Sequence, residues 1–193
     1  MITNLAVDIQ GFSSNAFLVE GDRTVLVDTG NDFDVVSAIE SRTDGLDAVV
    51  VTHTHPDHVG TLDAVRSAFD PEIVAYEGAI EDCDRELVDG DRVAIGDHRY
   101  RTLYTPGHKD DHIALFAPGP GIAFVGDLVF ANGGFGRTDL EGGDREQLIE
   151  SIEYLLTTVS DDHLDAMYCG HGPNVTTDPV HDIELALQAA RFR

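Results

Sequence analysis

The sequence predicts an α+β fold in which two β-sheets carry helices on their outer sides. Helical patterns occur near both ends of the chain, short apolar strand segments fill its middle, and turn residues separate those strands. The chain has 193 residues, of which 42% are hydrophobic. This length suits one domain with a substantial core, so we expect a single domain over residues 1–193.

The first third of the chain predicts a hairpin, a helix and a buried strand. Asn15–Glu20 and Thr24–Asp28 are short apolar runs separated by the turn pair Gly21-Asp22. Asp47–Thr52 is a continuous apolar run, typical of a strand buried on both faces. Between the hairpin and this strand, helical spacing relates Phe33, Val35, Val36 and Ile39.

The remaining chain continues with strands and three further helices. Strand-like runs occur at Ile73–Tyr76, Arg92–Ile95, Tyr100–Tyr104, Ile113–Phe116, Ile122–Val125 and Ala166–Cys169. Helical patterns occur at Val59–Phe69, from Leu148 to Val159, and at Asp182–Phe192.

The net charge is the most unusual property of the sequence. It has 36 acidic and 12 basic residues, a net charge of −24 at pH 7, and Lys109 is the only lysine. Acid of this density predicts a protein of a halophile, because concentrated salt screens the repulsion among carboxylates. An unusually acidic mesophilic protein is the other interpretation. In both interpretations the acidic surface disfavours binding of nucleic acid, because phosphate binding requires clustered Lys and Arg.

The sequence contains no run of eighteen apolar residues, so we expect no membrane span. The first twenty residues lack a basic segment followed by an apolar core, and therefore do not predict a signal peptide. Cys83 and Cys169 are the only cysteines, which indicates a reducing compartment. We therefore expect a cytoplasmic protein.

Three imidazoles and a carboxylate lie within six residues directly after the buried strand. They belong to the segment Thr52-His53-Thr54-His55-Pro56-Asp57-His58. Imidazole and carboxylate groups are ligands for zinc and similar divalent ions. In extended backbone, residues two apart point the same way, so His53 and His55 can share one ion. Asp57 and His58 follow the bend at Pro56 and can reach a second ion.

This His-x-His-x-Asp-His pattern resembles the signature of the metallo-β-lactamase superfamily. Further motifs of that family occur in the family's order: Thr105-Pro106-Gly107-His108, Phe124-Val125-Gly126-Asp127 and Gly170-His171-Gly172. Asp28-Thr29-Gly30 resembles the family's early Asp-x-Gly turn. The resemblance implies a four-layer αββα sandwich. It also implies a dinuclear metal site, with zinc as the expected metal and iron or manganese as possible ones.

The resemblance also assigns roles to individual residues. It implies that one metal is held by His53, His55 and His108 and the other by Asp57, His58 and His171, with Asp127 as the bridge. A dinuclear site activates water near neutral pH, which predicts a hydrolase. Asp57 is then expected to orient the attacking water as well as to bind metal. Of the other histidines we expect His112 to be structural or to support a ligand, and His98, His163 and His181 to lie at the surface. For Cys169 we expect a small buried strand residue.

The segment after Asp127 resembles glyoxalase II, which implies a small hydroxyacyl thioester as substrate. Arg137 matches the family's basic residue that contacts the carboxylate of the thiol, a role suited to the two parallel hydrogen bonds of a guanidinium. Two departures leave glutathione itself in question. Only 22 residues follow His171, whereas glyoxalase II carries a helical glutathione-binding domain there, and Asp139 replaces the family's aromatic residue.

Two other enzyme classes of the superfamily stay open. The Gly136–Asp139 string resembles the persulfide dioxygenases, which use one iron, and a nuclease is the third possibility. A nuclease fits the acidic surface poorly, and a binding protein that retains the site is the non-enzymatic interpretation. We expect a small-molecule substrate, no nucleic acid and no membrane partner. The oligomeric state stays open.

Overall fold

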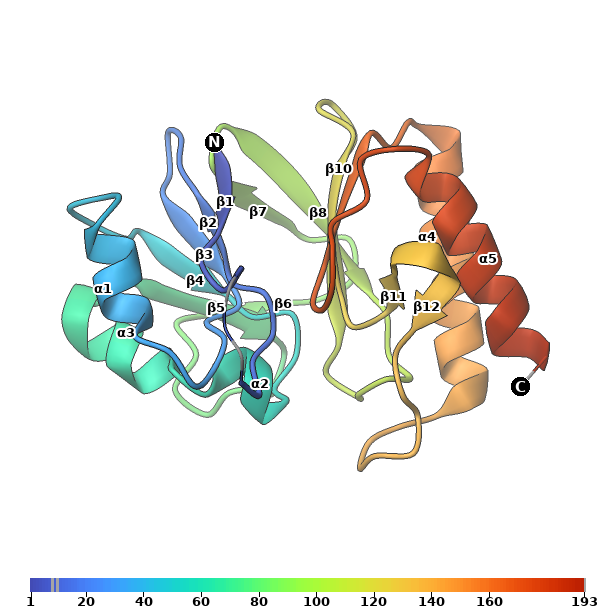
Figure 1. Cartoon of the computed structure of the whole chain (residues 1–193), viewed down its shortest axis with the longest axis horizontal. Helices are drawn as coiled ribbons and strands as arrows, with labels where there is room; N and C mark the ends of the chain where they lie inside the picture. Colours follow the sequence, from blue (N-terminus) through green and yellow to red (C-terminus); the bar gives the residue numbers. More distant parts are fainter. Residues whose placement is uncertain (8, 10, 193) are drawn as a thin grey trace. The chain divides into compact units, whose positions relative to one another are not determined.

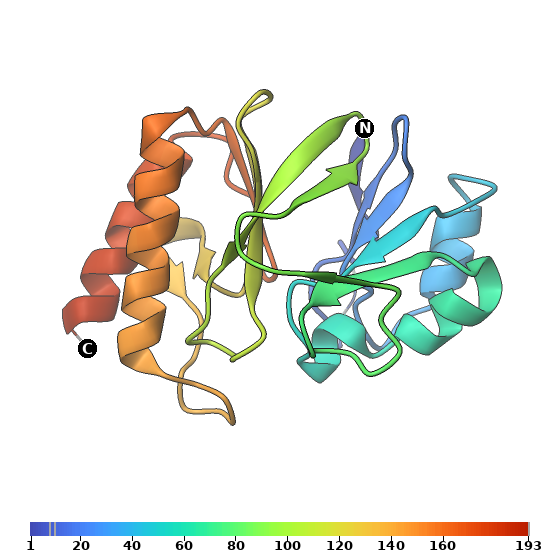
Figure 2. The ribbon, with the colours of Figure 1, turned by 180° about the vertical axis from the view of Figure 1, so that it is seen from behind.

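The computed structural model describes residues 1–7, 9 and 11–192. The chain divides into two compact units, unit 1 (Met1–Leu87 with Ala94–Asp97) and unit 2 (Val88–Val93 with His98–Arg193). Each unit has its own sheet and its own helices, α1 to α3 in unit 1 and α4 and α5 in unit 2 (Figures 1 and 2). The single domain expected over residues 1–193 stays a prediction.

Unit 1 is built on a six-stranded sheet in the sequential order β1-β2-β3-β4-β5-β6. Its strands are β1 (Ile2–Asn4), β2 (Phe17–Val19), β3 (Val25–Val27), β4 (Ala48–Val50), β5 (Glu72–Tyr76) and β6 (Arg85–Leu87). Neighbours from β1 to β3 are antiparallel, and those from β3 to β6 are parallel. The predicted hairpin is confirmed, since β2 pairs with β3. All three residues of β4 are buried, as expected for a central strand.

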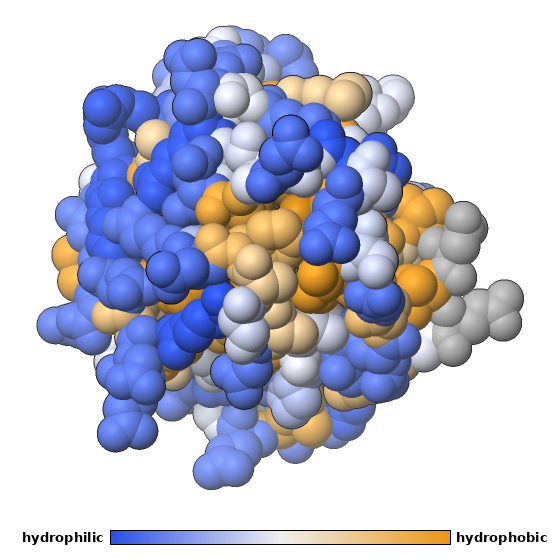
Figure 3. All heavy atoms as spheres, turned by 90° about the vertical axis from the view of Figure 1, so that its left-hand side faces the viewer, coloured by the Kyte–Doolittle hydropathy of each residue, from blue (hydrophilic) through white to orange (hydrophobic). Residues whose placement is uncertain are grey.

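Helices α1 (Val35–Glu40) and α3 (Leu62–Phe69) cover one face of this sheet (Figure 1). Helix α1 begins at Asp34, whose side chain accepts a hydrogen bond from the backbone of Ser37. The apolar faces of both helices pack into the core of unit 1, through Val35, Ile39, Leu62 and Val65. Figure 3 looks onto the side of the molecule with these helices, where hydrophilic residues surround a smaller apolar strip.

Unit 2 carries most of a five-stranded sheet of order β13-β10-β9-β8-β7. In chain order its strands are β7 (Arg92–Ile95), β8 (His98–Tyr104), β9 (Ile113–Ala117), β10 (Ile122–Gly126) and β13 (Ala166–Cys169). Strands β8 and β10 are each antiparallel to β9, whereas β10 and β13 are parallel. Each of these strands lies where the sequence predicts one, within two residues at either end.

Helices α4 (Arg145–Asp161) and α5 (Pro179–Phe192) lie side by side against this sheet (Figure 2). The predicted apolar stripe of α4 is buried at Leu148, Ile152, Leu155 and Val159. Asp144 begins the helix by accepting from the backbone N–H groups of Glu146 and Gln147. A small hairpin of β11 (Val129–Phe130) and β12 (Gly134–Phe135), joined by the 3₁₀ turn Ala131–Gly133, packs against α5.

The predicted helix over Val59–Phe69 is confirmed for Leu62–Phe69, whereas its first residue, Val59, belongs to a separate short helix. Helix α2 (Pro56–Val59) ends before Gly60, and α3 begins at Leu62. A Cβ atom at Gly60 would lie 2.2 Å from Oδ1 of Asn31, so only glycine allows this close approach. No helix within the described residues combines the length and the hydropathy that a membrane-spanning segment requires.

Candidate metal centre

In unit 1 the candidate ligands follow the carboxyl end of β4. Strands β3 and β4 are parallel, so their carboxyl ends meet at one edge of the sheet. Asp28 follows β3 at this edge, and the segment from Thr52 to His58 follows β4. Helix α2 then places Asp57 and His58 on consecutive positions of one helical turn, where both are buried.

The imidazoles of this segment lie close to one another. The Nε2 atom of His53 lies 3.1 Å from Nδ1 of His55, and the rings of His53 and His58 are 4.0 Å apart between centroids. Two nitrogens bound to one tetrahedral zinc ion at about 2.0–2.1 Å would lie about 3.3 Å apart. The spacing of His53 and His55 therefore suits two ligands of one ion. Nε2 of His58 and Oδ2 of Asp57 are 4.0 Å apart, which is wider than the spacing of about 3.3 Å expected for two ligands of one zinc ion.

In unit 2 the candidate ligands also follow strands that end at one edge of a sheet. Asp127 follows β10, and His171 follows β13 by one residue after Cys169. These two strands are parallel, and β8 runs in the same direction because it is separated from β10 by the antiparallel β9. The loop after β8 therefore brings His108 to the same edge as Asp127 and His171.

A single carboxylate oxygen in unit 2 is equally distant from two imidazoles. Oδ2 of Asp127 lies 3.4 Å from Nε2 of His108 and 3.4 Å from Nε2 of His171. Both distances are close to the spacing of about 3.3 Å expected for two ligands of one zinc ion. The side chains of His108 and Asp127 are nearly buried, whereas that of His171 is 40% exposed. Asp127 is thus positioned to share one ion with each histidine.

Hydrogen bonds fix which ring nitrogen of His108 carries the lone pair and hold the backbone of Asp127 in place. Nδ1 of His108 lies 2.8 Å from the backbone oxygen of Arg137, which can only accept, so the lone pair of this ring is on Nε2. The backbone N–H of Asp127 donates to Nε2 of His112 over 3.1 Å. Nδ1 of His112 then donates to the hydroxyl of Thr105, 2.8 Å away. His112 therefore holds the backbone of Asp127 in place, the supporting role that the sequence left open.

Arg137, the predicted contact for a substrate carboxylate, lies on a cavity of unit 2 of about 600 Å³. Phe130, Asn132 and Phe135 also line this cavity. The Arg137 side chain is 67% exposed, and its Nε and Nη2 atoms donate to both carboxylate oxygens of Asp139 at 2.9 Å. This pairing raises the pKa of the Arg137 guanidinium and lowers the pKa of the Asp139 carboxyl. A substrate carboxylate would have to replace Asp139 at this guanidinium.

The remaining predictions for individual residues agree with the structure. His98, His163 and His181 are exposed. Cys169 is fully buried on β13, and this burial raises the pKa of its thiol to about 12. Two residues that sequence reasoning did not assign to the site also lie in it. Thr52 contacts His53, and Asp28 contacts His58. Asp28 and His58 are thirty positions apart, so only the fold brings these two residues together.

Known proteins resemble this chain over nearly its whole length. The sequence pattern described as the metallo-beta-lactamase superfamily matches residues 9–171, which includes residues of both units. A hydroxyacylglutathione hydrolase of Chromohalobacter salexigens is 37% identical over 152 residues, which cover 78% of this chain and 57% of that protein. The chain thus spans little more than half the length of this relative.

Two crystal structures are similar in fold. ETHE1 from Myxococcus xanthus has a TM-score of 0.78 at 23% identity and is matched over 100% of this chain and 90% of its own. TTHA1623 in a di-iron-bound form has a TM-score of 0.75 at 28% identity, over 98% of this chain and 96% of its own. The expected fold is therefore confirmed, and this chain belongs to the metallo-β-lactamase superfamily.

Proposed function

We propose that this chain is a metal-dependent hydrolase that binds two divalent metal ions through seven residues, His53, His55, Asp57, His58, His108, Asp127 and His171. One observation carries the proposal. Oδ2 of Asp127 is 3.4 Å from Nε2 of both His108 and His171. A carboxylate in this position can bridge two ions when each histidine binds one of them.

The chemistry of the donor set suits such a pair of ions. Imidazole nitrogens and carboxylate oxygens are ligands for zinc, iron and manganese. We propose zinc, with iron and manganese as alternatives. TTHA1623, similar over nearly its whole length, has a di-iron-bound form, which supports two ions and keeps iron open. In this assignment His53, His55 and His108 bind one ion, whereas Asp57, His58 and His171 bind the other.

The residues around the ions would divide the work of hydrolysis. Bound metal ions would lower the pKa of a water molecule and polarise the bond that it attacks. Asp57 would orient this water with its carboxylate, because it is an acceptor held in the first turn of α2. The backbone N–H of Ser14 donates to the backbone oxygen of Asp57 over 3.1 Å, which fixes the start of that helix.

The proposed substrate is a small hydroxyacyl thioester. The relative from Chromohalobacter salexigens is a hydroxyacylglutathione hydrolase, which supports this reaction class. Arg137 would bind a carboxylate on the thiol, beside the cavity lined by Phe130 and Phe135. The proposal does not specify the carrier thiol, because the carboxylate of Asp139 lies beside Arg137 and would repel a strongly anionic thiol. A thiol with less negative charge would meet less repulsion there.

The test is metal analysis of the purified protein followed by a thioester assay. We expect about two ions per chain and release of free thiol from a hydroxyacyl thioester of glutathione or of another small thiol. Loss of both activity and metal on treatment with a chelator, with recovery on adding zinc, would support the assignment. Cleavage of RNA or a phosphodiester with no cleavage of any thioester would replace it by the nuclease alternative.

The same analysis separates the proposal from the persulfide dioxygenase alternative. That alternative is supported by the Gly136–Asp139 string, and it requires one iron per chain and uptake of oxygen with a persulfide substrate. One bound iron with no ligand role for Asp57 or His171 would favour it. Two ions with thioester cleavage and no oxygen uptake would exclude it.

A further inference from the structure

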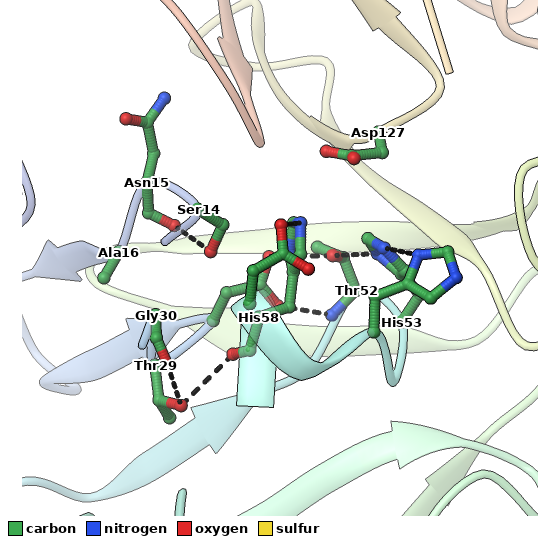
Figure 4. A network of polar contacts seen from close by, with 12 residues as sticks. Ser14, Asn15, Ala16, Thr29, Gly30, Thr52, His53, His58 and Asp127 are labelled. Carbon is green, nitrogen blue, oxygen red and sulfur yellow. Dashed lines mark hydrogen bonds and ion pairs between the residues drawn. The ribbon is translucent and has the colours of Figure 1, made fainter. Parts of the chain in front are cut away.

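The carboxylate of Asp28 contacts two residues of the histidine segment at once. Its Oδ1 atom accepts from the backbone N–H of Thr52 over 2.7 Å. Its Oδ2 atom accepts from the Thr52 hydroxyl over 2.7 Å and lies 2.8 Å from Nδ1 of His58. Asp28, Thr52 and His58 are at most 3% exposed, so these contacts are shielded from water. Figure 4 shows Thr52, His53 and His58 within this network of polar contacts.

The backbone holds Asp28 in a conformation that few residues adopt. Its φ angle is 56°, in the left-handed region, where a residue other than glycine is uncommon. The N–H of Asp28 donates to the backbone oxygen of Val50 on β4, which anchors the residue to the strand that leads into Thr52. A strained backbone maintained by several hydrogen bonds points to a role for the side chain that it positions.

The positions of the protons in this cluster follow from what each group can donate. A carboxylate only accepts, so Nδ1 of His58 carries a proton and the lone pair of that ring is on Nε2. The Thr52 hydroxyl has one proton, which it donates to Asp28. Its oxygen therefore accepts from Nδ1 of His53, 3.2 Å away, so the lone pair of His53 is also on Nε2.

We propose that Asp28, directly and through Thr52, sets the tautomers of His58 and His53 together, so that one carboxylate positions a ligand of each of the two metal ions. The metal part of this inference rests on the proposed function, which assigns His53 and His58 to different ions. Asp28 and Thr52 are positioning residues, because they act through the two histidines. Partners of this kind typically change metal affinity by about 10–100-fold when they are removed.

The tautomers can be measured without metal or substrate. In chelator-treated protein with ¹⁵N-labelled histidine, long-range ¹H–¹⁵N correlation spectra should show Nδ1–H for both His53 and His58. Thr52→Val should shift His53 toward a mixture of tautomers and leave His58 unchanged, whereas Thr52→Ser should restore the wild-type spectrum. Asp28→Asn should alter both rings. Thr102→Val is a matched control, because Thr102 is equally buried and no hydrogen bond of its hydroxyl is found among the described residues.

Metal affinity then tests whether the tautomers matter for binding. In competition with a coloured chelator, Thr52→Val should weaken one of the two ions by about tenfold or more, and Thr52→Ser should not. The inference is overturned if His53 keeps Nδ1–H in Thr52→Val, or if the tautomer changes while both affinities stay at wild-type values. Failure of the wild type to bind two ions would instead overturn the proposed function, and the spectra would still decide the role of Thr52.

Discussion

Two candidate ligands, His58 and His108, present defined atoms because the Nδ1 atom of each ring already has a partner within the same unit. His58 donates from Nδ1 to Asp28, and His108 donates from Nδ1 to the backbone oxygen of Arg137. Each ring therefore directs its Nε2 lone pair toward the cluster before any ion binds. Metal binding and activity at such a site should depend strongly on each ligand residue and weakly on nearby exposed carboxylates.

Asp57→Asn tests this dependence at the residue proposed to bind metal and orient water. The amide keeps the size of the side chain but is a poorer ligand and carries no charge. We expect kcat for thioester hydrolysis to fall by orders of magnitude, because one substitution removes two roles. The matched control is Asp63→Asn, an exposed carboxylate on α3, which should retain wild-type kcat and metal content. Equal activity of the two variants would remove Asp57 from the proposed site.

Arg137→Ala tests substrate binding, and the pairing with Asp139 determines the size of the effect. The side chain of Arg137 is 67% exposed, so solvent screens its charge. We expect KM for a thioester with a carboxylate on its thiol to rise roughly two- to fivefold, with kcat unchanged. The backbone oxygen that holds His108 remains in this variant, so metal content should not change.

Asp139→Asn should have the opposite effect on the same substrate. Removing the carboxylate that occupies both Arg137 nitrogens should lower KM for an anionic thioester. A thioester without a carboxylate on its thiol is the control, and its KM should be the same in both variants and in the wild type. Steady-state kinetics at the lowest salt concentration that keeps the protein folded would measure this. An anionic substrate unaffected by either variant would show that Arg137 does not contact it.

At the scale of elements, the segment after β12 packs tightly against two of the three candidate ligands of unit 2, His108 and Asp127. A Cβ atom at Gly136 would lie 2.1 Å from the backbone oxygen of Asp127 and 2.9 Å from the ring of His108. Gly136→Ala must therefore displace both residues. We expect a loss of stability of about 1–3 kcal/mol, as for overpacking elsewhere, together with lower metal occupancy. Chemical unfolding and metal analysis would measure the two effects.

Gly119→Ala is the matched control for this prediction. Gly119 lies in the turn between β9 and β10, and a Cβ atom there would meet nothing within 4 Å. Its stability and metal content should match those of the wild type. If Gly136→Ala behaved in the same way, the close packing of this segment would not be needed to hold His108 and Asp127.

The elements that the sequence predicted well are those whose burial pattern is local. Arg92–Ile95 and Ala166–Cys169 form strands with the predicted bounds, because glycine and aspartate residues next to these short segments mark their ends. The helix predicted over Val59–Phe69 is confirmed over Leu62–Phe69, but the break between α2 and α3 was missed because apolar spacing continues through Gly60. At this break Gly60 closely approaches Asn31, which is nearly thirty positions away. Periodicity cannot report such a contact.

The candidate metal ligands could be predicted from the sequence, but the residues that hold them in position could not. His53, His55 and His58 stand close in the sequence, and the motifs around His108, Asp127 and His171 have a recognisable order. The residues that hold these ligands in position lie farther from them in the sequence. Asp28 reaches Thr52 and His58 only because β3 and β4 are parallel neighbours, and the Asp-Thr-Gly turn gives no indication of which side chains it contacts.

At the scale of the whole molecule, the net charge of −24 acts against folding. Few basic residues are present to offset 36 carboxylates, and ion pairs such as Arg191–Glu153 involve only a small number of them. Repulsion among the remaining carboxylates favours the expanded unfolded chain. The apolar cores of the two units, or the solvent, must therefore offset this repulsion in the folded state. Screening by salt is the compensation that the composition predicts.

If the protein is adapted to concentrated salt, its thermal midpoint should rise steeply between about 0.1 M and 1 M potassium chloride, over which the screening length falls from ~10 Å to ~3 Å. Calorimetry would measure this rise. The control is a variant with three exposed carboxylates neutralised on different helices, Glu40→Gln, Asp63→Asn and Glu150→Gln. Because it has less repulsion to screen, it should be more stable than the wild type at low salt and converge with it at high salt. A wild type equally stable at both concentrations would show that its acidity serves another purpose.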